Sequence, residues 1–77
     1  MSRITVRYFA SLREQLGRDE EQVDVAGIRC VADVWSRVCV APFPANTLIA
    51  INQEYASLAS AVRAGDEVAF FPPVTGG

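Results

Sequence analysis

The sequence predicts an α+β domain, in which one main helix packs across one face of a mixed sheet. Residues 3–10 alternate between two sides, which is the pattern of a half-buried strand. Residues 31–38 carry apolar side chains at i, i+3, i+4 and i+7, which form the buried stripe of a helix. The order strand-helix-strand-helix-strand-strand-strand contains no repeat and no internal linker. With 77 residues, the chain has room for one small core.

The first expected element is the strand at residues 3–10. Its side chains Ile4, Val6 and Tyr8 share one side and are expected to face the core. Phe9 therefore falls on the opposite side or at the end of the strand.

A short helix and a second strand are expected next. Ser11 and Glu14 have the spacing of a capping box, in which both side chains satisfy the first helical amides. Gly17 can end this helix in the left-handed conformation. Residues 21–25 alternate again and predict a second strand that ends at Gly27.

The main helix is expected over residues 31–38, with Trp35 in the core. Its N-cap falls near Cys30, where Ser, Thr or Asp would cap better, so we expect a weak start. Cys30 and Cys39 are nine residues apart and would lie on opposite helix faces, so they are expected to remain free thiols. Residues 41–46 contain two prolines, which break the helix.

The C-terminal half is expected to supply three strands joined by short turns. In order, we predict a buried strand at 48–51, a polar turn at 52–54 before Tyr55 and Ala56, a short helical turn at 57–62, a turn at Gly65 and Asp66, and a last strand at 67–71. Pro72 and Pro73 stop that strand, because proline cannot donate to a ladder.

The chain ends in Gly76 and Gly77, directly behind an aromatic and proline-rich segment at 70–75. Two glycines make the thinnest peptide a protein can offer, able to enter a narrow tunnel and present its carboxylate to another enzyme. That carboxylate is ionised at neutral pH, so it is a nucleophile towards an α-phosphate but a poor acyl electrophile until activated. We expect a domain at 1–73 and a flexible tail at 74–77; the alternative is a frayed chain end without a role.

Three aromatic side chains are expected on the side of the sheet away from the core. Phe9 follows from the parity of the first strand, and Phe71 from the last strand if Val68 and Phe70 face inward. Tyr55 follows a turn and is not needed inside. An exposed apolar patch of this kind marks an interface, unless a second layer of the fold covers it.

Composition excludes several classes of function. The net charge is −2 without a basic run, which argues against a nucleic-acid partner. No metal site is expected, because histidine is absent and the two cysteines lack zinc-site spacing. No P-loop or glycine-rich nucleotide fingerprint is present, so ATP would have to be bound by a partner. Without a signal peptide or an apolar run of membrane-spanning length, we expect a cytoplasmic protein with no membrane association.

Three segments resemble the small, sulfur-carrier subunits of molybdopterin synthase. They are 6–10 (VRYFA), 50–54 (AINQE) and above all 65–77 (GDEVAFFPPVTGG). The resemblance spans essentially the whole chain and implies a ubiquitin-like β-grasp fold, with the last strand central and paired to the first. The stretch 37–46 departs from the family, because it is short and carries Phe43 between two prolines.

The resemblance also implies a chemistry centred on Gly77. A ubiquitin-activating-type adenylyltransferase joins its carboxylate to AMP from ATP, and a sulfur donor such as a cysteine desulfurase or rhodanese-like protein replaces AMP to leave a thiocarboxylate. The large synthase subunit accepts the tail, and the sulfur passes to cyclic pyranopterin monophosphate to build the molybdopterin dithiolene. In the family, two small subunits flank a dimer of the large one.

The expected site therefore has two parts. Gly77 carries the sulfur on the slender end provided by Gly76, and the partner-binding residues are Phe9, Tyr55, Phe71, Pro72, Pro73, Val74 and Thr75. The chain is not expected to be an enzyme by itself. Two alternatives stay open: a sulfur carrier for another acceptor, such as a thiamine precursor or tRNA, and a ubiquitin-like protein modifier.

Overall fold

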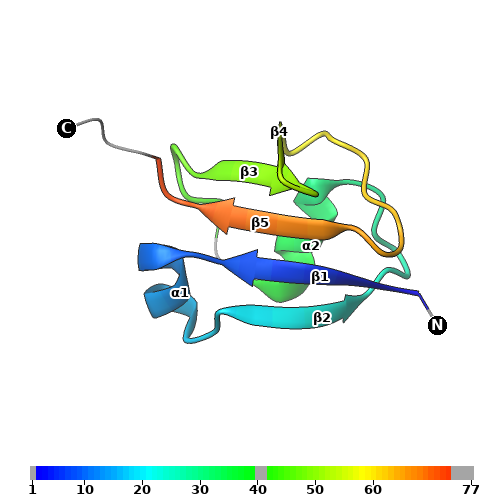
Figure 1. Ribbon diagram of the computed structural model, residues 1–77, viewed down its shortest axis with the longest axis horizontal. Helices are drawn as coiled ribbons and strands as arrows, with labels where there is room; N and C mark the ends of the chain where they lie inside the picture. Colours follow the sequence, from blue (N-terminus) through cyan, green and yellow to red (C-terminus); the bar gives the residue numbers. More distant parts are fainter. Residues whose placement is uncertain (1, 40–41, 74–77) are drawn as a thin grey trace.

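The computed structural model describes residues 2–39 and 42–73, which form one five-stranded mixed sheet with two helices (Figure 1). The elements are β1 (Arg3–Tyr8), α1 (Ala10–Leu16), β2 (Glu20–Asp24), α2 (Val31–Val38), β3 (Leu48–Ile51), β4 (Glu54–Ala56) and β5 (Glu67–Phe71). The strand order is β2-β1-β5-β3-β4, and α2 crosses one face of this sheet. The predicted α+β architecture and all five strands are confirmed.

Strand β5 occupies the centre of the sheet, as expected. It runs parallel to β1, with Val6 opposite Val68, and antiparallel to β3, with Ile51 opposite the same Val68. Because β5 pairs on both sides, the segment that leads to the C-terminus leaves from a strand held by two ladders. The strand ends at Phe71, where Pro72 has no N–H to continue the ladder.

The core lies between the sheet and α2, and its centre is the buried ring of Phe70. Tyr8 stacks on Phe70 with ring centroids 6.2 Å apart, and Trp35 meets it edge-on at 5.2 Å. Phe43, from the proline-containing loop, also packs against Phe70 at 5.9 Å. The predicted inward positions of β1 and the core position of Trp35 are therefore confirmed.

The start of α1 differs from the expected capping box. The helix begins at Ala10 with Phe9 as N-cap and no side-chain cap, so Ser11 lies inside the first turn. The cause is tertiary, because the Phe9 N–H still donates to the Phe70 carbonyl at 3.2 Å and the chain leaves the sheet only there. Gly17 ends the helix in the left-handed conformation, with φ 69°, as predicted.

The short helical turn expected at 57–62 is wrong, because this segment forms a β-turn and then an isolated bridge to Cys30. Its carbonyls accept hydrogen bonds from N–H groups of α2 and do not form a helix within the segment. The Leu58 and Ser60 carbonyls accept from the N–H groups of Ala32 and Val31, both at 3.0 Å. These are first-turn amides that have no partner inside α2.

The same contacts correct the expected weak start of α2. Cys30 is the N-cap, as predicted, but the Asp33 carboxylate reaches back and accepts from the N–H groups of Arg29 at 3.0 Å and Cys30 at 3.3 Å. The bond from the Arg29 N–H, followed by that from Cys30, holds the pKa of Asp33 below its ordinary value. Cys30 and Cys39 cap opposite ends of α2 and are both free, half-buried thiols.

Candidate docking face and C-terminal tail

The root of the tail lies within the described part of the chain, and its end does not. Pro72 is half-buried and Pro73 is exposed, directly after the central strand. The predicted site residues Val74, Thr75, Gly76 and Gly77 lie outside the described residues, so their roles remain predictions.

The structure brings Phe9, Tyr55 and Phe71 together on the sheet face opposite α2. The Phe9 and Phe71 rings meet edge-on with centroids 6.5 Å apart, and Tyr55 lies 6.1 Å from Phe71. Phe9 is 40% exposed, Tyr55 is 78% exposed, and Phe71 is half-buried between them. No described element lies over this face, since α2 lies behind the sheet in Figure 1. We call these three residues the aromatic cluster.

A hollow of about 370 Å³ adjoins the aromatic cluster on the same face. Ala50 and Ala69 form its floor, because they are direct cross-strand partners on β3 and β5. Phe9 and Phe71 stand at one end, and Gln53 lies on the rim. The small floor side chains leave a depression between larger neighbours.

Two charged side chains, Arg7 and Glu67, line this hollow, and Glu20 is the cross-strand partner of Arg7 outside that lining. Arg7 lies opposite Ala69 in register, and its guanidinium is 3.4 Å from carboxylate oxygens of both Glu20 and Glu67. The same guanidinium lies 5.5 Å from the centre of the Phe9 ring, within cation–π range. Arg7 therefore contacts both the two glutamates and the aromatic cluster on the open face.

Sequence reasoning missed the hollow and its charged border. The parity argument that placed Phe9 and Phe71 on the open face also places Arg7 and Ala69 there, two residues earlier on each strand. The alternation of residues 3–10 already puts Arg7 on the side of Phe9, and the same argument applied to every residue of β5 would have added Ala69. Ala50 could be assigned to the hollow only once the pairing of β3 with β5 was known.

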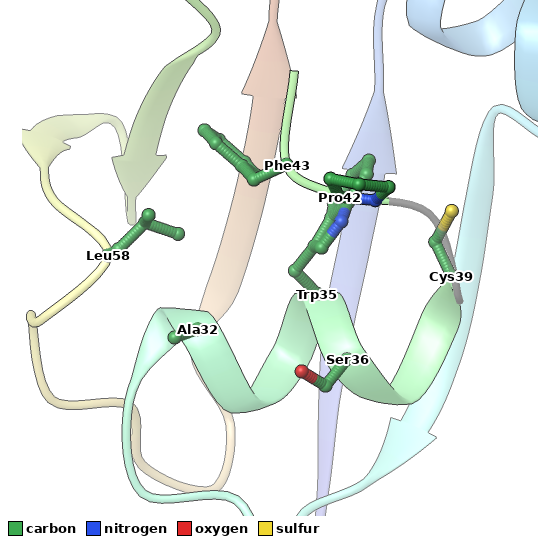
Figure 2. Close-up of a pocket in the computed structure, with 7 residues that line it drawn as sticks. All are labelled: Ala32, Trp35, Ser36, Cys39, Pro42, Phe43 and Leu58. Carbon is green, nitrogen blue, oxygen red and sulfur yellow. The ribbon is translucent and has the colours of Figure 1, made fainter. Parts of the chain in front are cut away.

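A second hollow, of about 460 Å³, lies on the helix side of the molecule (Figure 2). It is lined by Ala32, Trp35, Ser36, Cys39, Pro42, Phe43 and Leu58. Trp35 lies at its centre, with Leu58 at one end and the Cys39 thiol at the other. No Asp, Glu or Arg lines it, so the described lining offers no acid–base pair.

Within residues 2–39 and 42–73, no group of three or more His, Cys, Asp or Glu side chains could hold a metal ion. Over the same residues, no helix is long and apolar enough to cross a membrane. The described residues instead form a domain whose central strand, paired on both sides, leads toward the C-terminus beside an exposed aromatic face, which is the arrangement expected of a carrier-type domain.

Comparison with known proteins agrees with that class. The ThiS family pattern matches residues 6–77, so the chain belongs to the ThiS family. It is 42% identical over 83 aligned residues to the molybdopterin synthase sulfur carrier subunit of Haemophilus influenzae, covering 96% of this chain and 99% of that protein. It is 39% identical to the protein of the same name from Escherichia coli, with the same coverage.

The fold is likewise shared with solved structures. The crystal structure of the small archaeal modifier protein 1 of Haloferax volcanii superposes with a TM-score of 0.79 at 29% identity, covering 96% of this chain and all of that one. The resemblance to the sulfur carriers and the predicted β-grasp fold are thus confirmed.

Proposed function

We propose that this chain is the sulfur carrier subunit of a molybdopterin synthase, with Gly77 as the residue that carries the sulfur. The observation that supports this most directly is the near full-length similarity to two proteins of that name, at 42% and 39% identity. The fold agrees, because the tail begins at the end of the central strand beside an exposed aromatic face.

The proposed chemistry acts on the C-terminus and uses the domain as its handle. The Gly77 carboxylate attacks the α-phosphate of ATP held by an adenylyltransferase, pyrophosphate leaves, and an acyl adenylate forms. The persulfide of a sulfur donor such as a cysteine desulfurase or rhodanese-like protein then displaces AMP to give an acyl disulfide. A thiol attacks that disulfide, which releases the thiocarboxylate and leaves a new disulfide on the donor side. The sulfur passes to cyclic pyranopterin monophosphate, and two such transfers build the dithiolene.

Each part of the tail has a separate role in this scheme. Gly76 keeps the end slender, and Pro72 and Pro73 stiffen the root, which reduces the entropy lost on insertion. From Pro72 to Gly77 the extended chain spans about 20 Å. Val74 and Thr75 are proposed to contact the partner along the inserted tail.

The large synthase subunit docks on the aromatic cluster, around the tail. Phe9, Tyr55 and Phe71 supply apolar area that is exposed in the free domain, and burying it favours association. In this proposal two small subunits flank a dimer of the large subunit, and the chain is not an enzyme by itself. Two free cysteines suit a reducing cytoplasm, where we place the reaction.

Intact mass measurement tests the carrier chemistry directly. The protein is incubated with ATP, the activating enzyme and a sulfide source, with a Gly77 deletion variant as the control. We expect a mass gain equal to replacement of one oxygen by sulfur, absent from the deletion variant. An unchanged mass in the intact protein would overturn the proposal.

A protein modifier is the second candidate, favoured by the similarity to the small archaeal modifier protein 1. Its signature would be a ladder of higher-mass adducts in cell extract that depends on Gly77. Since the chain contains no lysine, it cannot extend such adducts into chains of itself through side-chain amines. Free thiocarboxylate without adducts would exclude this role.

A further inference from the structure

We propose that the alanine-floored hollow receives one bulky apolar side chain of the large synthase subunit, and that a basic side chain of the same partner lies beside it. This rests on the proposed function and adds to it a specific seat on the open face. The seat fixes how the two proteins register along β5, and hence how far the tail projects.

The shape of the hollow follows from the register of all five strands. One transverse row of side chains runs Glu20, Arg7, Ala69, Ala50 and Tyr55, each the direct partner of the next. Directly paired residues point to the same side of a sheet, so all five lie on the open face. The row has long side chains at its ends and two methyl groups at its centre.

The neighbouring row raises one wall of the hollow. Phe71 lies two residues beyond Ala69 on β5, so it projects from the same face, with Phe9 edge-on to it. An apolar side chain seated over Ala50 and Ala69 would touch these rings and remove them from water. Its burial would join the aromatic cluster into one continuous apolar contact, which is how strong interface anchors are arranged.

The charge at the border favours a basic neighbour. Arg7 is shared by Glu20 and Glu67, so the three groups together carry one negative charge. Arg7 reaches Oε2 of Glu67, and no contact among the described residues engages Oε1 of that carboxylate. A partner carboxylate would meet two Glu side chains here, whereas a partner Lys or Arg would meet net attraction.

The position of the seat gives it control over the tail. Ala69 stands eight residues before Gly77, and strand residues advance about 3.3 Å each. A partner side chain anchored over Ala69 therefore fixes the start of the arm. A slip of one residue along β5 would move the tail by about 3.3 Å.

Filling the hollow tests the seat. Ala69→Leu adds three carbon atoms to the floor, and Ala69→Val adds two in a side chain well suited to a strand. The matched control is Ala59→Leu, which makes the same change at an exposed turn away from the open face. Circular dichroism and thermal unfolding verify the fold of each variant, and affinity for the large subunit is measured by titration calorimetry.

We expect at least about tenfold weaker binding for Ala69→Leu, a smaller loss for Ala69→Val, and none for the control. Full affinity in a folded Ala69→Leu or Ala69→Val variant would overturn the seat while leaving the proposed function intact. If the unmodified chain itself fails to bind the large subunit, the proposed function falls and the seat with it.

The basic neighbour has its own test. Glu67→Gln removes one negative charge from the border, and Glu14→Gln on α1 is the control at an exposed site away from the sheet. We expect Glu67→Gln to slow association about two- to fivefold at low salt, with the difference lost at about 1 M salt. Unchanged or faster association would overturn the basic neighbour.

Discussion

The hydroxyl of Tyr8 is expected to make a pH-dependent contribution to the free energy of unfolding. Removing that one oxygen atom isolates the contribution. The Tyr8 side chain is 1% exposed, and its hydroxyl donates to Oε2 of Glu21 at 2.6 Å. Burial, then the hydrogen bond and the nearby charge of Glu21, raise the pKa of Tyr8 well above its ordinary value of 10. Tyr8→Phe removes the titrating group and keeps the ring that stacks on Phe70.

Two opposing magnitudes follow. At neutral pH the variant loses one hydrogen bond to a carboxylate, which costs about 1.5 kcal/mol, while Glu21 keeps Arg18 at 2.8 Å. The folded protein holds the Tyr8 proton where the unfolded chain releases it, so the contribution of Tyr8 to stability is full below pH 10 and declines above it. The loss reaches about 1.4 kcal/mol at pH 11 and about 2 kcal/mol at pH 11.5.

The two stability curves are therefore expected to cross near pH 11. Urea unfolding followed by circular dichroism between pH 7 and 11.5 measures both. Because the chain contains no lysine, no side-chain ammonium titrates in this window. Tyr55→Phe is the matched control for removal of a phenol oxygen, since this ring is 78% exposed. A constant difference between wild type and Tyr8→Phe up to pH 11.5 would refute the reasoning.

Two further substitutions address the open face and the hairpin turn. Phe71→Arg disrupts the centre of the aromatic cluster and is expected to weaken binding to the large subunit by about 30-fold or more in titration calorimetry. Leu58→Arg, on the helix side, is the control. Undiminished binding of Phe71→Arg would contradict the docking role. Gln53→Gly is expected to stabilise the domain by about 1 kcal/mol in thermal unfolding. The reason is that Asn52 and Gln53 have φ angles of 51° and 71°, the left-handed pair that Asn-Gly turns prefer. An unchanged or lowered melting temperature would contradict this prediction.

Local pattern was sufficient for the strands and for the face on which each side chain lies. The alternation of β1 and β5 gave both the core positions and the aromatic cluster, because strand parity requires no knowledge of partners. The helix expected at 57–62 was wrong since its carbonyls bond amides of α2, which lie far away in the sequence. The start of α1 was wrong for a similar reason, a bond from Phe9 to Phe70.

The hollow is harder to predict from the sequence, because it depends on how the strands pair. Ala50 and Ala69 are unremarkable alanines until β3 and β5 pair, and only then do they form a floor. The pairing of Arg7 with both Glu20 and Glu67 likewise depends on β1 lying between β2 and β5. Sites built from register need the strand order as well as the pattern within each strand.

The central place of β5 also determines how the domain responds to mechanical force. A pull on the tail is directed along β5, whose hydrogen bonds to β1 and β3 lie across the direction of the pull. The two ladders are then loaded in shear, so many bonds must fail together instead of opening one after another. An edge strand could be peeled away from its one neighbour, whereas a pull on β5 loads both of its ladders at once.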